Sequence, residues 1–397
     1  MTLPTLLLSA ACADRPPESA AHPQAEWISE PDYHIGDAMT GDGVFGWVGY
    51  VRVSPDGRRV FVLEPNQARV TVWTPGGRLL LDLGGAGEGP GDFMLPYRIH
   101  AWESGFYVRD QVRFSFFSYD GTLLRTVPNP PTLVSYQGFQ IQVGAILEDG
   151  SFLGHPDIPA SIELGLWGDD PIDSLPLLRV WESDAGWSRE PVVWRNIRNA
   201  TLHVPFDDGM LMAGQPFSDS DPYKLDRGAG TVVVARMRRD YLGPGEVEFL
   251  ETNAYGDTVW RRRLAFRPIR LARPMLEEAI DENAQLLKQE ENENLFGGRS
   301  AREAVEDALY KPEYLSAGDA FLLASSGRHI WLRSHEQVDT LRVWYTIERN
   351  DSESPPRRVL LPESVLFWDM TDTHVWGIWK DELDISYVVG RRLVPPG

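Results

Sequence analysis

The chain has 397 residues, of which 58 are acidic and 38 are basic, so its formal net charge is −20 at pH 7. This excess of negative charge opposes binding to DNA, RNA or an anionic membrane surface. Hydrophobic residues make up 42% of the sequence, which excludes a largely disordered chain. The single cysteine excludes both an internal disulfide and a metal site built from several cysteines.

The first eleven residues are apolar and end in small residues directly before Cys12. A membrane-spanning helix takes ~20 apolar residues, so this stretch is too short to cross a bilayer. It resembles the end of a bacterial lipoprotein signal peptide. We therefore interpret residues 1–12 as a signal segment, Cys12 as the lipid attachment site and residues 13–26 as a flexible tether. An exported protein is expected, periplasmic or on the cell surface, and held to the membrane by its lipid only. The alternative is an apolar terminus in which the cysteine is incidental.

From residue 27 onward, short runs of β-branched and aromatic residues alternate with turn sequences such as Ser54–Gly57. Gly, Asn and Asp in such turns adopt the backbone conformations that tight hairpins need. The pattern of Gly57–Leu79 returns in Gly105–Leu123, offset by 44 to 48 residues. Further sequences of this kind begin at Gly150, Gly209, Gly327 and Thr373.

Repeats of roughly 40 to 50 residues with about four short strands each are typical of a β-propeller. The six sequences above therefore predict an all-β, six-bladed β-propeller over residues 27–397. The last repeat has strand sequences near Val365–Met370, His374–Lys380 and Ile385–Leu393, one fewer than a blade requires. We predict that Trp27–Ile35 supplies the fourth, outermost strand, which closes the ring and removes exposed sheet edges.

One insertion, residues 273–311, separates the fourth and fifth predicted blades. A helix is predicted at its start, with apolar residues on one face at Leu276, Ile280, Ala284 and Leu287. A second short helix follows, and Ser300 with Glu303 has the spacing of a capping box. We expect this helical pair to cover one blade, and a ligand lid is the alternative.

Two segments resemble the bacterial NHL-like six-bladed β-propeller family. They are the loop Gly84–Phe93, with the sequence Gly-Gly-Ala-Gly-Glu-Gly-Pro-Gly-Asp-Phe, and the C-terminal segment Val375–Asp384. The resemblance extends over about residues 27–395. It implies the propeller fold and export, often as a lipoprotein. It leaves the activity open, because this fold hosts unrelated functions.

Common catalytic motifs are absent from the sequence. Neither Gly-x-Ser-x-Gly nor His-Glu-x-x-His occurs, and Gly84–Phe93 precedes a predicted strand instead of the helix of a phosphate-binding loop. Acidic clusters at Asp169–Asp173 and Asp219–Asp221 leave calcium open as a ligand, although solvated loop acids are commoner. We therefore expect no cofactor.

Polar residues that end the second strand of each predicted blade form the candidate binding site. Loops after the second strands open on one face of a propeller, so these side chains are expected to ring the mouth of its channel. They are Glu64, Asp110, His155, Gln215, Arg333 and Asp381. The simpler alternative is that strand ends are polar in any case.

These features favour a non-catalytic binding or protein-interaction scaffold, monomeric, with a small-molecule or protein ligand on the channel-mouth face. The leading alternative is a metal-dependent propeller hydrolase of the lactonase type, or a lyase, with Glu64, Asp110 and Asp381 near the metal. Arg333 at an equivalent position would repel a cation, which weakens this alternative. A third interpretation is a sensor or assembly factor that docks through residues 273–311.

Overall fold

The structure is a computed structural model that describes residues 26–36, 44–131, 135–136, 139–156, 173–206, 209–226, 230–238, 245–288, 299–349, 351 and 353–396. Within these residues the chain is almost entirely β, which confirms the predicted all-β class. Its described helices are α2 (Arg273–Lys288), α3 (Ala301–Ala308) and the short 3-10 helix η1 (Pro65–Gln67). Cys12 and the whole of the predicted signal segment lie outside the described residues.

Four-stranded sheets in which each strand pairs with the next along the chain are the repeating unit. The first contains β2 (Tyr50–Val53), β3 (Val60–Glu64), β4 (Arg69–Trp73) and β5 (Leu79–Gly84). The second contains β6 (Arg98–Trp102), β7 (Gly105–Arg109), β8 (Arg113–Ser118) and β9 (Leu123–Pro128). A later one contains β17 (Tyr223–Asp226), β18 (Thr231–Arg238), β19 (Gly245–Asn253) and β20 (Thr258–Phe266). Neighbouring strands in all three are antiparallel, as hairpin connections require.

Two larger sheets contain most of the remaining strands. One contains β10 (Ser135–Tyr136), β11 (Phe139–Ile146), β12 (Phe152–Pro156), β13 (Ser174–Ser183) and β14 (Gly186–Asn196). The other has eight strands in the order β21 (Ala320–Leu323), β22 (His329–Val338), β23 (Leu341–Glu348), β24 (Arg357–Pro362), β1 (Trp27–Ile35), β27 (Ser386–Val394), β26 (His374–Lys380) and β25 (Val365–Met370).

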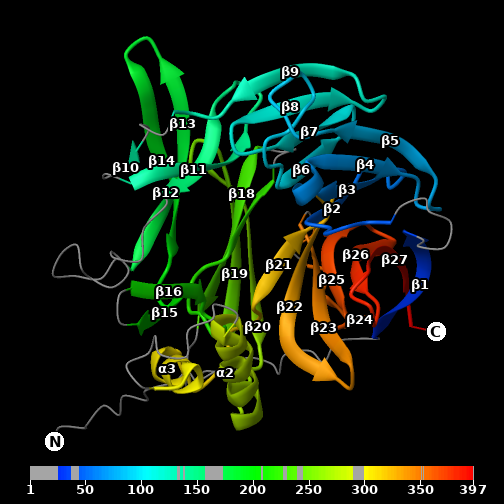
Figure 1. Cartoon of the computed structure of the whole chain (residues 1–397). Coiled ribbons are helices and arrows are strands. Elements are labelled where there is room, and N and C mark those ends of the chain that lie inside the picture. The colour runs from blue at the N-terminus through cyan, green and yellow to red at the C-terminus, as the bar shows by residue number, and fades with distance from the viewer. Residues whose placement is uncertain are drawn as a thin grey trace, which may run out of the picture.

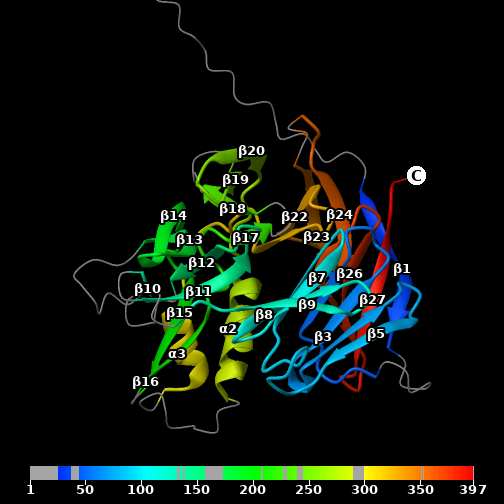
Figure 2. The same cartoon turned by 90° about the horizontal axis from the view of Figure 1, so that it is seen from above.

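The strand β1 lies between β24 and β27 in this eight-stranded sheet, and Figures 1 and 2 both show it beside the C-terminal strand. It pairs antiparallel with β27 from Ile28 opposite Val394 to Ile35 opposite Val388. Its first two residues also pair with β24, in the parallel direction. One sheet therefore joins the first described strand to the last.

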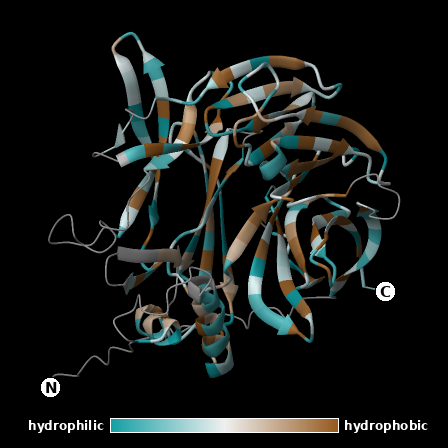
Figure 3. Cartoon of the chain, in the orientation of Figure 1, coloured by the Kyte–Doolittle hydropathy of each residue, from teal (hydrophilic) through white to brown (hydrophobic). Residues whose placement is uncertain are grey.

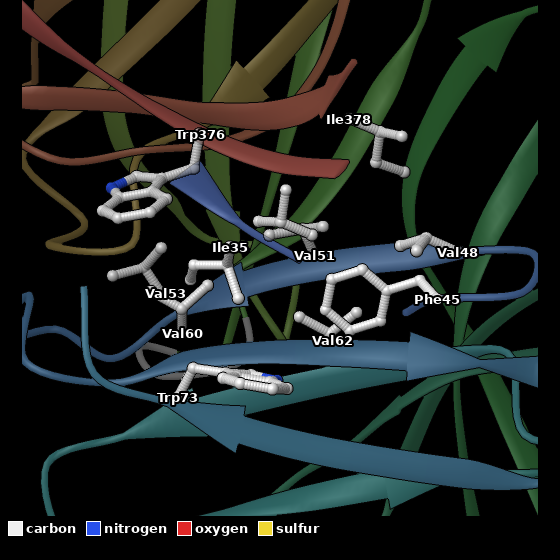
Figure 4. Close-up of a cluster of buried hydrophobic side chains, with 11 residues drawn as sticks. Ile35, Phe45, Val48, Val51, Val53, Val60, Val62, Trp73, Trp376 and Ile378 are labelled. Atoms are coloured by element: carbon white, nitrogen blue, oxygen red, sulfur yellow. The ribbon is translucent and has the colours of Figure 1, made fainter. Parts of the chain in front are cut away.

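The hydrophobic core is divided among the spaces between neighbouring sheets, and Figure 3 shows hydrophobic residues running along the strands with hydrophilic ones between them. Figure 4 shows the cluster between the first and last sheets. There Val51 from β2, Ile35 from β1 and Trp376 from β26 are at most 2% exposed. Burial of such side chains is the main favourable contribution to folding.

A separate hairpin of β15 (Thr201–Phe206) and β16 (Gly209–Gly214) stands outside the four-stranded pattern. The prediction that Gly209 begins the second strand of a blade is therefore wrong. In the corresponding sheet the second strand is β18. The sequence misled because a Gly turn followed by apolar residues fits any hairpin. Here the hairpin buries Leu202 and Val204 against the helices.

Helices α2 and α3 lie beside this hairpin in Figure 1. Ile280 of α2 and Val305 of α3 are at most 1% exposed and belong to the same cluster as Leu202. The predicted capping box is confirmed, because Ser300 accepts a hydrogen bond from the Glu303 amide and the Glu303 carboxylate accepts one from the Ser300 amide. The described contacts thus make the helical pair a cover for the hairpin.

The loop after β5 depends on glycine and on one arginine. Gly84 has φ 95° and Gly91 has φ 88°, in the region that favours glycine. The Arg113 guanidinium donates hydrogen bonds to three loop carbonyls, those of Glu88 at 3.1 Å and of Gly89 and Asp92 at 2.9 Å each. A Cβ on Gly84 would lie 2.4 Å from the Phe93 ring, which is fully buried.

We expect Gly84→Ala to lower the free energy of unfolding by about 2 kcal/mol or more, because backbone strain adds to overlap with a buried ring. Gly57→Ala is the matched control, since Gly57 has φ 71° and nothing within 4 Å of the added Cβ. That control should lose only about 1 kcal/mol, the cost of a left-handed backbone. Urea denaturation measures both. Equal losses would mean that Phe93 moves aside at little cost.

Candidate binding site in the central cavity

A cavity of about 1780 Å³ runs through the centre of the described sheets. Its wall includes residues from the strands β2, β6, β11, β17, β21 and β25. Sheets arranged around a channel with their first strands innermost are the arrangement of a β-propeller. Ligand sites usually have volumes of roughly 300 to 1,000 Å³, so this cavity has room for a small molecule or a short chain segment.

The two ends of this channel differ in the loops that surround them. We call the end at the turns between first and second strands the turn side, where Trp102 pairs with Gly105 and Asp226 pairs with Thr231. We call the opposite end the loop side, where Arg98 pairs with Arg109. Both ends contribute to the cavity wall.

The cavity wall is richer in cations than in carboxylates, in contrast to the chain as a whole. Its carboxylates are Glu103, Asp226 and Glu251. Its cations are Arg52, Arg98, Arg109, Lys224, Arg328 and Arg349. In a chain of net charge −20, the described wall of the channel therefore opposes an anion less than the net charge suggests.

On the turn side, Arg349 forms ion pairs with two of the wall carboxylates. Its guanidinium lies 2.6 Å from the Asp226 carboxylate and also pairs with Glu251. Thr231 donates a further hydrogen bond to Glu251 at 2.6 Å. Burial alone would lower the pKa of Arg349, but the two carboxylates outweigh it and raise that pKa. This group ties the sheet of β17–β20 to the chain that follows β23.

Also on the turn side, Asp369 joins the last sheet to the first. Its side chain is fully buried and accepts hydrogen bonds from the amides of Val53 at 2.7 Å and Met370 at 2.8 Å. The Arg52 guanidinium lies 3.2 Å away. Burial raises the pKa of Asp369 to about 6, although Arg52 and the amide donors oppose the shift.

Aromatic rings accompany the cations on the loop side. The Arg109 guanidinium lies 4.7 Å from the centre of the Tyr97 ring, and that of Arg98 lies 6.0 Å from the Tyr50 ring. These distances suit cation–π contacts. In such a contact the N–H groups of the guanidinium remain able to donate hydrogen bonds to a ligand. The His155 and Tyr223 rings meet edge to face, with 5.9 Å between centroids. Such a wall offers both charge and flat apolar surface.

Of the six residues predicted to ring the channel mouth, the structure places only His155 in the cavity wall. Glu64 is 1% exposed and accepts a hydrogen bond from the Gly46 amide at 3.0 Å, and its burial raises its pKa. Asp110, also 1% exposed, accepts hydrogen bonds from the amides of Val112 and Arg113 at 2.8 Å each. The Glu64 carboxylate therefore ties the segment before β2 to the end of β3, and the Asp110 carboxylate stabilises the loop after β7.

The other three predicted residues also lie apart from the cavity wall. Gln215 follows β16 in the separate hairpin. Arg333 makes two hydrogen bonds to Asp319, at 2.6 and 2.8 Å. Asp381 accepts hydrogen bonds from the amides of Ile385 and Leu383, and these donors lower its pKa. The expected ring of six polar side chains is therefore not what the structure shows, because strand-end residues are used to cap turns.

Sequence reasoning missed the cations of the first strands. Arg98, Lys224 and Arg52 each lie on an inner strand and line the cavity. Alternation along these strands would not have found them, because consecutive residues such as Tyr223–Asp226 all line the cavity. Their place in the wall follows from the arrangement of the sheets around the channel.

Among the described residues, no three His, Cys, Asp or Glu side chains lie together in a way that could hold a metal ion. Asp221 is the most buried residue of the acidic cluster Asp219–Asp221, at 7% exposed. Its carboxylate accepts a hydrogen bond from the Asn196 backbone amide at 2.9 Å. Much of the other cluster, residues 169–172, lies outside the described residues. No helix in the described part of the chain is long and apolar enough to cross a membrane.

No family model matches the chain, and no curated protein matches it in sequence. Solved structures that match the chain over most of its length include a member of the DUF4221 family from Bacteroides vulgatus, with 7% identity, a TM-score of 0.48 and coverage of 94% of this chain and 99% of that one. An exported protein from Bacteroides fragilis matches with 12% identity and a TM-score of 0.41, over 92% of this chain and 96% of that one. The PQQ-bound aldose sugar dehydrogenase of Streptomyces coelicolor matches with 11% identity and a TM-score of 0.37, over 94% of this chain and all of that one. Such low identities transfer no function.

Proposed function

We propose that the protein is a non-catalytic binding scaffold that takes up its ligand in the central cavity, with no cofactor. The observation that carries the proposal is the cavity itself, which is large and whose wall combines cations, amides and aromatic rings. A largely preformed cavity that carries a small number of well-placed polar groups is typical of a ligand site. The cations of its wall oppose a catalytic metal ion, which is why we place binding before the metal-dependent hydrolase or lyase.

The proposal includes the architecture that holds this site. We propose that the sheets form six blades around the channel and that β1 closes the ring as the outermost strand of the last blade. Its antiparallel pairing with β27 supports this closure. Pairing of the two chain ends also removes a free edge from the last blade, which protects a propeller from aggregation. We expect the protein to work as a monomer.

We further propose that the protein is exported and anchored through lipid on Cys12, which precedes a tether-like sequence. An anchored scaffold keeps a bound ligand or partner near the membrane without entering it. Cys12→Ser should move the protein from the membrane fraction to the soluble fraction. Retention of this variant in the membrane fraction would contradict lipid anchoring.

Blocking the loop side of the channel tests ligand binding there. Gln140 is exposed on β11 and lines the cavity, so Gln140→Trp should fill part of the entrance without disturbing a core. Small molecules from a mixed panel that raise the melting temperature of the unaltered protein should lose that effect in this variant. The matched control is Leu124→Trp on the outer strand β9, where Leu124 is 59% exposed. Equal stabilisation of both variants would place the binding elsewhere.

A further inference from the structure

The charges of the channel wall are separated along its length. All three wall carboxylates lie on the turn side, because Glu103 is in the turn after β6, Asp226 ends β17, and Glu251 contacts the same Arg349 as Asp226. Arg52, Arg328 and Arg349 lie at that end too. Cations and carboxylates are therefore balanced on the turn side.

Among the residues that the structure describes, the cavity wall on the loop side contains cations and no carboxylate. Arg98 begins β6 and Arg109 ends β7 opposite it, and Lys224 lies midway along the channel on β17. The described wall there also contains neutral polar groups, among them the amide of Gln140. The field inside the channel thus favours a negative group near the loop side.

Arg98 is the cation best placed to meet a ligand. It is exposed, lines the cavity, and makes no ion pair within the described residues. Its partner in the structure is the Tyr50 ring, at 6.0 Å, which holds one part of the guanidinium. A guanidinium presents several N–H donors in one plane, and these fit the paired oxygens of a carboxylate or phosphate.

We infer that the loop side of the channel binds a small organic anion through a carboxylate or phosphate group held by Arg98. This inference rests on the proposed binding function and adds the class of ligand. The rings of Tyr50, Tyr97 and Tyr223 provide flat surface for the uncharged part of the ligand, and the Gln140 amide can bond to its hydroxyl or carbonyl groups. The ligand enters with its anionic group toward Arg98 and Arg109, away from the carboxylates of the turn side.

Calorimetric titration of the full chain tests the inference with four probes, namely citrate, pyrophosphate, glucose and spermidine. Citrate or pyrophosphate should bind, and the stronger of the two identifies the anionic group as carboxylate or phosphate. Arg98→Gln should weaken that binding about tenfold, the effect of losing one charge-assisted hydrogen bond. Arg125→Gln is the matched control, because Arg125 also covers an aromatic ring, at 4.4 Å from the Phe116 centroid, but lies exposed on the outer strand β9.

Each outcome decides a separate question. Equal weakening in both variants would show a general charge effect and overturn the assignment to Arg98. Binding of neither anion, or stronger binding of spermidine, would overturn the inference that the ligand is an anion. If neutral panel molecules still bind and are blocked in Gln140→Trp, the proposed binding function stands and only the ligand class fails. If no anion binds and Gln140→Trp blocks no neutral molecule either, the cavity is not the binding site.

Discussion

Replacing Ile35 with aspartate is expected to lower the free energy of unfolding by at least about 4 kcal/mol, since a carboxylate would be buried without a partner. Ile35 is 1% exposed and lies among apolar side chains of the first and last sheets, including Val51 and Trp376 (Figure 4). Because Ile35 packs against side chains of both sheets, the substitution disrupts the packing between them. Chemical denaturation followed by tryptophan fluorescence measures the loss.

The control for this experiment lies on the same strand. Ile28 is 44% exposed, so Ile28→Asp should cost less than about 1 kcal/mol. A small and equal loss for both substitutions would show that β1 adds little to the fold, and that the ring does not depend on it. A large loss for Ile35→Asp alone is the result expected of a closing strand.

Asp369→Ala is expected to cost about 3 to 5 kcal/mol, because removing one member of a buried ion pair leaves the other charge uncompensated. The amides of Val53 and Met370 also lose their acceptor. Asp369→Asn keeps the shape and removes the charge, so it should cost less. Denaturation at pH 7 compares the two variants, and a loss below about 1 kcal/mol for Asp369→Ala would contradict the proposed role of this pair.

The pH dependence of stability provides an independent check on Asp369. Burial raises its pKa from 3.8 to about 6, so the folded state holds this proton more tightly than the unfolded state. The corresponding stabilisation is fully present below pH 3.8 and is lost as the pH rises through 6. It amounts to about 3 kcal/mol by linkage. In Asp369→Asn this component should vanish, and an unchanged pH profile would assign it to another group.

The sequence predicts the strands of the last sheet closely. The expected strands Val365–Met370 and His374–Lys380 coincide with β25 and β26, and Trp27–Ile35 coincides with β1. These segments are short, rich in β-branched and aromatic residues and bounded by turn residues, so local preference and burial agree. The capping box of α3 is equally local, and it too is found as predicted.

The binding site was harder to predict, because its residues are brought together only by the ring. Gln215 follows a hairpin whose local pattern is that of a blade strand, and only its packing against α2 and α3 distinguishes it. Asp110 has the polarity of a site residue, but its oxygens accept hydrogen bonds from nearby amides. Arg98 and Lys224 come from different sheets, and their common place in the wall depends on how those sheets are arranged around the channel.

Crystals soaked in bromide would show whether the cavity binds anions at its loop side. Bromide scatters anomalously, so its positions can be located without assuming a ligand. We expect bromide beside Arg98 and Arg109 in the loop side of the channel, and none beside Asp226 and Glu251 on the turn side. Bromide confined to the outer surface, with an empty loop side, would contradict this expectation.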